Sequence, residues 1–231
     1  MDKLRQFTLR KYKSGWAHSK TLAFAKVSLK YLARVRLGTR YQAFELFLEM
    51  PKVVKARKRV TNRIITKKDV ETVLSHIEIA ETEGRISSER ALNYTAFVLF
   101  GAYTGQRSLA TMSKLTVGQL RKALHQTKPV LHVKSSQDKI RMEHSVPLHP
   151  QLIDSLHPLV ESRPDDDFMF EYEGFIQWVK RQKIPLSRIS GHFVLGDLRK
   201  FAEQYGDIIQ WEQSNRAYIL THGVSGVQWS H

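Results

Sequence analysis

The sequence predicts a mainly α-helical protein of the α+β class, in which a small antiparallel β-sheet accompanies the helices and a short basic helical segment precedes them. Three observations lead to this class. Apolar residues recur at helical spacing along most of the chain, two short stretches alternate in hydrophobicity as strands do, and basic residues gather near the N-terminus. The chain of 231 residues contains no cysteine, so a hydrophobic core must stabilise it without disulfides.

The N-terminal segment, residues 1–60, holds 16 of the 37 Lys and Arg residues but only three of the 22 acidic residues. The rest of the chain is almost neutral, although the whole carries a net charge of +15. Within Ser19–Val35, apolar positions follow helical spacing, and Lys26, Lys30 and Arg34 recur every four residues. Like charges at this spacing repel one another, so a polyanion lying along the helix would stabilise it.

A basic linker ends this segment and places the predicted domain boundary near residue 60. The linker residues, the helix residues Lys26, Lys30 and Arg34, and one lysine of the second domain are all predicted to contact double-stranded DNA. The linker residues are Lys55, Arg57, Lys58 and Arg59, and the lysine of the second domain is Lys139. A basic surface that only keeps the protein soluble is the alternative interpretation.

The second domain, residues 61–231, is predicted to be helical because capping residues precede each apolar periodic stretch. Thr66 and Asp69, for example, form a capping-box pattern in front of such a stretch. The predicted helices run from Thr66 to about Glu83, from Ser87 or Ser88 towards Gly101, from Thr116 through Leu124, and over Pro150–Val160, Tyr172–Gln182, Asp197–Tyr205 and Ile208–Leu220.

The small sheet is predicted from two alternating stretches, Val130–Val133 and Ile140–Val146. The polar residues Ser135–Asp138 lie between them. This pattern is typical of a β-hairpin with a flexible tip.

Several function classes are excluded by what the sequence lacks. It has no apolar stretch long enough for a membrane span and no signal-peptide pattern, so an intracellular setting is expected. It has no nucleotide-binding glycine motif, and its ten His residues show no metal-ligand spacing. No metal or nucleotide cofactor is therefore expected.

Four short motifs instead form an ordered set. Tyr103-Thr-Gly-Gln-Arg107 closes an apolar helix, the hairpin carries Lys134 and Lys139, Gly196-Asp-Leu-Arg199 begins a helix, and Leu220-Thr-His222-Gly follows the next one. In this order the motifs resemble those of the tyrosine recombinase (phage integrase) family. The resemblance runs from about residue 60 to the C-terminus, with the basic segment in the place of a core-binding domain. In detail the chain looks most like the integrases of archaeal viruses and plasmids.

The resemblance implies a role for each basic residue of these motifs. Arg107 and Arg199 would clamp the scissile phosphate, a role suited to a permanently charged, forked donor. Lys134 would be the general acid that protonates the leaving oxygen, with Lys139 as its competitor, and His222 would hydrogen-bond the phosphate. The alternatives are surface ion pairs for the arginines, a solvated charge for the lysine, and a histidine that interacts with a helix C-terminus.

The chain departs from the family pattern at three places. Gly196 stands where the family has a His, for which His192 is a possible substitute or simply a loop residue. Ala110 stands where the family often has an acid, which leaves open what orients the first arginine. No tyrosine follows His222, and Tyr218 is expected to be a core residue, so the given chain is expected to stop before the nucleophile.

The function implied is site-specific DNA recombination through a 3′-phosphotyrosyl intermediate. The family implies a homotetramer on DNA, and a monomer is expected without it. A type IB topoisomerase is the enzymatic alternative, because it uses the same chemistry on one duplex. A non-catalytic DNA-binding regulator is the alternative from another class, which the absent tyrosine and Gly196 favour. RNA binding is a third interpretation, but it lacks a recognisable aromatic stacking platform.

Overall fold

The computed structural model describes residues 63–161 and 163–221 and isolated residues between 6 and 35. The chain divides into two compact units, Met1–Thr61 and Asn62–His231. In the first unit, the described residues between 21 and 35 are helical, as predicted. The predicted contacts Lys26, Lys30, Arg34, Lys55, Arg57, Lys58 and Arg59, together with His222, lie outside the described residues.

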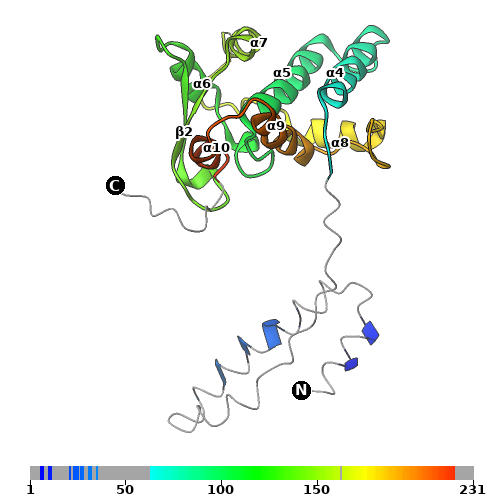
Figure 1. The fold of residues 1–231 in the computed structure, drawn as a ribbon, viewed down its shortest axis with the longest axis vertical. Coiled ribbons are helices and arrows are strands. Elements are labelled where there is room, and N and C mark those ends of the chain that lie inside the picture. Colours follow the sequence, from blue (N-terminus) through cyan, green and yellow to red (C-terminus); the bar gives the residue numbers. More distant parts are fainter. Residues whose placement is uncertain are drawn as a thin grey trace. The chain divides into compact units, whose positions relative to one another are not determined.

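The second unit is mainly helical with a two-stranded antiparallel sheet, which confirms the predicted class (Figure 1). Two short 3-10 turns, η2 and η3, interrupt the connections. In chain order the elements are α4 (Lys67–Thr82), α5 (Ser88–Thr104), η2 (Met112–Lys114), α6 (Val117–Leu124), β1 (Val130–Val133), η3 (Ser135–Gln137), β2 (His144–Pro147), α7 (Pro150–Val160), α8 (Tyr172–Gln182), α9 (Gly196–Ile208) and α10 (Gln213–Ile219).

The first helices begin where their capping residues predict. Thr66 and Thr116 form capping boxes in front of α4 and α6, and the Ser87 hydroxyl accepts a hydrogen bond at the start of α5. Helix α5 ends at Gly105, whose φ of 63° is left-handed and whose N–H donates to the carbonyl of Gly101. The residues that follow this glycine therefore leave the helix in a tight turn.

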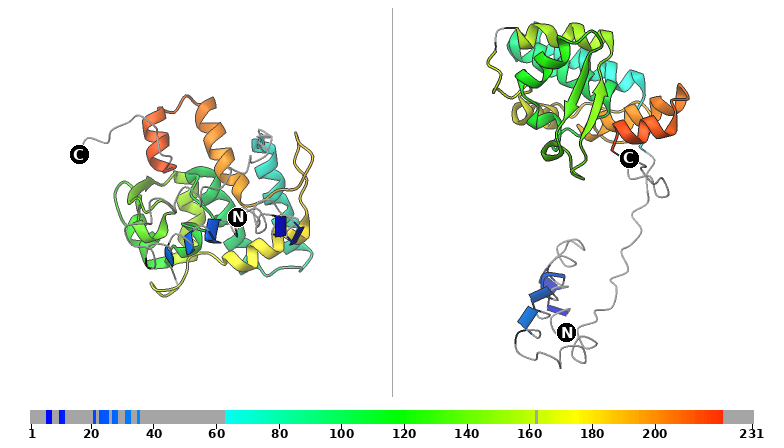
Figure 2. Two further views of the ribbon diagram at one scale, coloured as in Figure 1. Left: turned by 90° about the horizontal axis from the view of Figure 1, so that it is seen from below. Right: turned by 90° about the vertical axis from the view of Figure 1, so that its left-hand side faces the viewer.

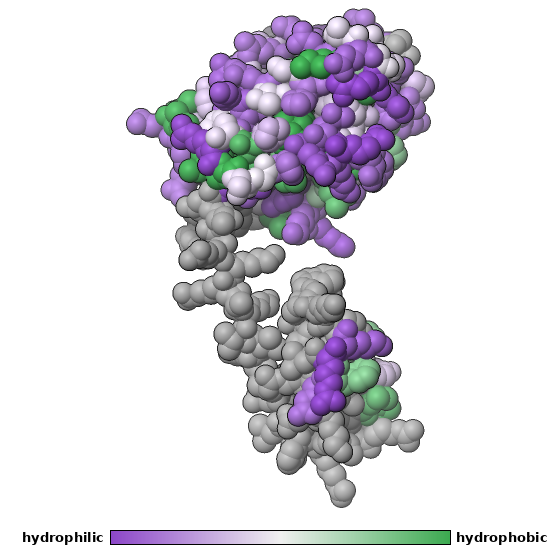
Figure 3. Space-filling model, turned by 90° about the vertical axis from the view of Figure 1, so that its right-hand side faces the viewer, coloured by the Kyte–Doolittle hydropathy of each residue, from purple (hydrophilic) through white to green (hydrophobic). Residues whose placement is uncertain are grey.

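Helix α5 lies at the centre of the core, packed against α4, α7 and α9. Its Tyr94 and Phe97 contact Phe175 of α8, with ring centroids 4.7 and 5.0 Å apart. Burying one such side chain contributes about 2 kcal/mol. The turn after α5 is therefore attached to a helix packed at the centre of the core. On the face of the second unit that Figure 3 shows, most described side chains are hydrophilic, with apolar ones scattered among them.

The predicted hairpin is present, but its tip differs from the prediction. Val130 pairs with Pro147 and Val133 with His144. The returning strand begins at His144 rather than Ile140, because the preceding residues fold around Asp138. Asp138 and its neighbour Gln137 are buried, so the tip is anchored to the domain rather than free.

The helix predicted over Ile208–Leu220 is present, but its predicted start is wrong. Helix α9 continues to Ile208, and α10 begins only at Gln213, as Figure 2 shows. Gln210 adopts a left-handed φ of 52°, and the N–H of Trp211 donates to the carbonyl of Gly206 at 2.8 Å. These interactions end one helix and turn the chain into the next. Among the described residues, no helix is both long enough and apolar enough to cross a membrane.

Candidate functional site

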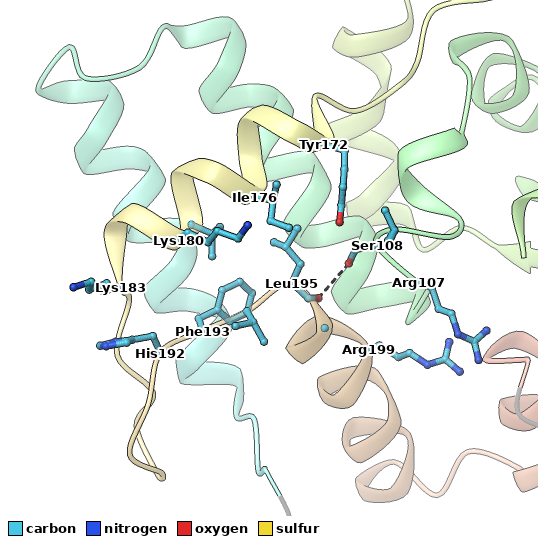
Figure 4. Close-up of a pocket in the computed structure, with 14 residues that line it drawn as sticks. Arg107, Ser108, Tyr172, Ile176, Lys180, Lys183, His192, Phe193, Leu195 and Arg199 are labelled. Carbon is cyan, nitrogen blue, oxygen red and sulfur yellow. Dashed lines mark hydrogen bonds between the residues drawn. The ribbon is translucent and has the colours of Figure 1, made fainter. Parts of the chain in front are cut away.

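A cavity of about 590 Å³ opens beside the turn that follows α5 (Figure 4). This volume lies within the range of ligand-binding clefts. Its middle is apolar, with two arginines at one end and two lysines and a histidine at the other. The lining residues are Arg107, Ser108 and Leu109 from the turn, Tyr172, Ile176, Val179, Lys180 and Lys183 from α8 and its end, His192, Phe193, Val194 and Leu195 from the following loop, and Gly196 and Arg199 from α9.

Arg107 reaches this site from the turn after the buried helix α5. Its side chain is 23% exposed, and its Nη1 donates to Oδ1 of Asp138 at 3.0 Å and to the hydroxyl of Thr221. The neighbouring Ser108 hydroxyl donates to the carbonyl of Leu195 at 3.2 Å. The turn is therefore fixed on one side to the hairpin and on the other to the loop that leads into α9.

Arg199 projects from the first turns of α9 and is only 13% exposed. Its Nη1 donates to the carbonyl of Gly105 at 3.0 Å and its Nη2 to the carbonyl of Leu220, while Nε lies 3.5 Å from Glu203. Burial, and secondly the positive charge of Arg107, lower the pKa of Arg199 to about 10. Glu203 and Asp138 act against this shift without cancelling it. Arg107 and Arg199 each have one carboxylate partner, so the lowered pKa reflects mainly the burial of Arg199, and a bound anion would favour its charged form.

His144 and Gln106 lie beneath the two arginines. His144 Nε2 is 3.2 Å from Oε1 of Gln106, whose Nε2 donates to the carbonyl of Ile219 at 2.8 Å. Burial lowers the pKa of His144, and Arg107 and Arg199 add to this effect against the backbone of Met142 and the charge of Asp138. Through Gln106, the His144 ring therefore connects β2 to the turn after α5 and to the end of α10.

The structure brings Arg107 and Arg199, far apart in the sequence, to one cavity, as the motif order led us to expect. Lys134 and Lys139 are exposed residues of the hairpin and do not line the cavity. His192 and Gly196 do line it. A Cβ at Gly196 would meet nothing within 4 Å, so this position has room for a side chain. The roles assigned to these residues remain predictions.

Two tyrosines that precede His222, Tyr218 and Tyr205, have structural contacts. The hydroxyl of Tyr218 accepts a hydrogen bond from the N–H of Ser145 at 3.3 Å, and its ring meets His144 edge-on. Tyr205 stacks on Phe201 with ring centroids 5.6 Å apart.

The sequence analysis missed Asp138, Thr221 and the α8 wall of the cavity. Tyr172, Ile176 and Val179 recur at helical spacing, which does indicate a buried face of α8. Asp138 gave no such signal, because a polar stretch between two strands is typical of a turn. It nonetheless provides the carboxylate for Arg107 that Ala110 does not. Within the described part of the chain, no three His, Asp or Glu side chains form a group that would hold a metal.

Comparisons with known proteins find similar structures but no similar sequence. No protein-family model and no curated protein sequence matches the chain. Among solved structures, the XerA recombinase is 13% identical over 96% of this chain and 89% of its own, with a TM-score of 0.49. The Tn1549 transposon integrase, solved in complex with circular intermediate DNA, is 11% identical over 96% of this chain and 77% of its own, with a TM-score of 0.58. The second likeness shows that this chain shares the fold of that integrase.

Proposed function

We propose that this chain binds double-stranded DNA and holds one phosphodiester between Arg107 and Arg199, as a site-specific DNA recombinase of the tyrosine type. One observation carries the proposal. Two guanidiniums from separate segments line the same cavity, and the positive charge of Arg107 contributes to the lowered pKa of Arg199. Paired arginines of this kind suit the two non-bridging oxygens of a phosphate, which gain charge in the transition state.

The reaction that fits this clamp is a phosphoryl transfer to tyrosine. The phenol oxygen would form a bond to phosphorus while the bond from phosphorus to the 5′-oxygen breaks, leaving a 3′-phosphotyrosyl link. The 5′-oxygen would take its proton from a general acid, for which Lys134 is our first candidate and Lys139 the second. His222 would donate a hydrogen bond to the phosphate.

The basic first unit would contact phosphates of the duplex through its lysines and arginines. Four protomers would assemble on two duplexes, so that each freed 5′-hydroxyl attacks the partner strand. The origin of the chain in an archaeal virus or plasmid is a hypothesis that rests on the motif pattern alone.

Binding of a labelled duplex to the full chain tests the clamp. Arg107→Ala is expected to weaken binding about tenfold, since it removes a charge-assisted contact to phosphate. Arg85→Ala is the matched control, because Arg85 is an exposed arginine that does not line the cavity. This control should bind within about twofold of the wild type. Equal affinities for both variants would refute the clamp.

A second candidate function is a DNA-binding regulator without cleavage activity, favoured by the lack of a side chain at Gly196. Incubation of a version extended past His231 to include a tyrosine with a suicide duplex in EDTA separates the candidates. A covalent protein–DNA product that depends on Arg107 supports strand transfer, whereas tight binding without this product supports the regulator. Relaxation of supercoiled DNA without strand exchange would identify a topoisomerase instead.

A further inference from the structure

The buried carboxylate of Asp138 joins three segments that carry predicted site residues. It contacts Arg107 directly, it belongs to the hairpin tip that begins at Lys134, and it accepts a hydrogen bond from Thr221, which immediately precedes His222. No other side chain in the described part of the chain is shown bonding to both Arg107 and the end of the α10 region. Asp138 is therefore placed to set these segments relative to one another.

The two carboxylate oxygens of Asp138 contact different segments. Oδ1 accepts from Arg107 Nη1 at 3.0 Å and from the Thr221 hydroxyl at 3.1 Å. Oδ2 accepts the backbone N–H groups of Ile140 at 2.9 Å and Met142 at 3.2 Å, which shape the returning half of the tip. One oxygen thus fixes the arginine, and the other fixes the loop that separates Lys134 from β2.

The carboxylate is ionised at neutral pH. Burial by itself would raise the pKa of Asp138, but the N–H groups of Met142 and Ile140, the Thr221 hydroxyl and the charge of Arg107 together lower it. The side chain is 1% exposed, so water does not compete for these bonds. An ionised carboxylate that accepts four hydrogen bonds holds the flexible arginine side chain in one position.

We propose that Asp138 is a positioning residue, which holds Arg107 and the hairpin tip in the one arrangement that accepts a DNA phosphate. The proposal rests on the proposed function, since it assumes that Arg107 meets phosphate. It differs from the alternative that Asp138 is merely a neighbouring negative charge. A neighbouring negative charge repels phosphate, so its removal tightens DNA binding, whereas loss of a positioning residue weakens binding.

The test is a double-mutant cycle read by duplex binding, with the full chain as wild type, Arg107→Ala, Asp138→Asn and the double variant. Asp138→Asn is expected to bind about fivefold more weakly than the wild type despite its more positive net charge. The double variant should bind within about twofold of Arg107→Ala, because Asp138 acts through Arg107. Additive losses would overturn this assignment.

Asp69→Asn is the matched control. Asp69 is also buried, its pKa is likewise lowered by backbone N–H groups against the opposing effect of burial, and it lies outside the cavity lining. The substitution makes the same change in net charge, so its DNA affinity should equal or slightly exceed that of the wild type. A loss as large as that of Asp138→Asn would indicate a general effect of buried-carboxylate removal and overturn the proposal.

Thr221→Val keeps the test decisive if Asp138→Asn fails to fold by circular dichroism. It removes one donor to Oδ1 of Asp138 and one acceptor of Arg107 without changing charge, and about twofold weaker binding is expected. Tighter or unchanged binding in every folded variant, with Arg107→Ala still weakened, would overturn the positioning role alone. If Arg107→Ala binds as the wild type does, the proposed function fails, and the positioning role fails with it.

Discussion

The two arginines of the cavity are held in different ways. Arg107 is 23% exposed and bonds to side chains, Asp138 and Thr221, that come from the hairpin and the region after α10. Arg199 is 13% exposed and bonds mainly to backbone carbonyls, those of Gly105 and Leu220. A backbone carbonyl moves only when the fold moves, whereas a side-chain partner is set by its own local contacts. The position of Arg199 is thus determined by the fold, and that of Arg107 by a small network of side chains.

The largest expected difference between them is in stability. Arg199→Ala leaves two carbonyls without their donor in a buried place, and we expect it to lower the free energy of unfolding by about 3 kcal/mol. Arg107→Ala, at a more exposed position, should cost about 1 kcal/mol. Urea unfolding of both variants at neutral pH measures this. Equal losses would mean that the two side chains are held equally by the fold.

Acidification should weaken the network of Arg107 in a second test. The folded-state pKa of Asp138 is lowered, so its stabilisation is fully present above the unfolded pKa of about 3.9 and is lost as the pH falls through the folded pKa. The unfolding free energy of the wild type should therefore fall below about pH 4, and that of Asp138→Asn should fall less. Asp69 shifts in the same direction in both proteins, so it does not affect the difference. Parallel pH profiles would contradict an ionised Asp138.

Gly196→His tests whether a DNA phosphate binds beside Arg199. The position has room for a Cβ, so little loss of stability is expected. A phosphate nearby would favour the charged imidazole, and DNA binding should tighten about threefold from pH 8 to about pH 6 relative to the wild type. Gly196→Ala is the control and should show no added pH dependence. The same pH profile in both variants would place the phosphate elsewhere.

The smallest expected effect concerns the far end of the cavity. Lys180 is exposed and lines that end. Lys180→Ala should weaken duplex binding about twofold. If Lys180 contacts one phosphate, the substitution should also reduce the slope of log affinity against log salt concentration by about 0.9. Lys122→Ala, an exposed lysine of α6 outside the cavity lining, should leave the salt dependence unchanged. Identical slopes for both would confine DNA contacts in this domain to the arginine end.

Local signals predicted much of the fold. The bounds of α7 and α8 agree with those predicted, because a proline at the start of α7 and strong apolar periodicity in both define them. A break between α9 and α10 was predicted, but its position was not predictable, since it depends on the left-handed Gln210 and on where Trp211 packs. The motif order led us to expect the two arginines together, but nothing local marks Asp138. Its burial depends on donors from residues 107 and 221, which only the folded chain brings near.

The carbonyls that hold Arg199 belong to Gly105 and Leu220, the residues that terminate α5 and α10. Helix C-termini carry partial negative charge, so one guanidinium neutralises two of them while standing near the beginning of a third helix. Any substitution at residue 199 consequently alters the junction of three helices as well as the proposed contact to phosphate. Assays meant to isolate recognition are better made at residue 107, with residue 199 kept for questions of architecture.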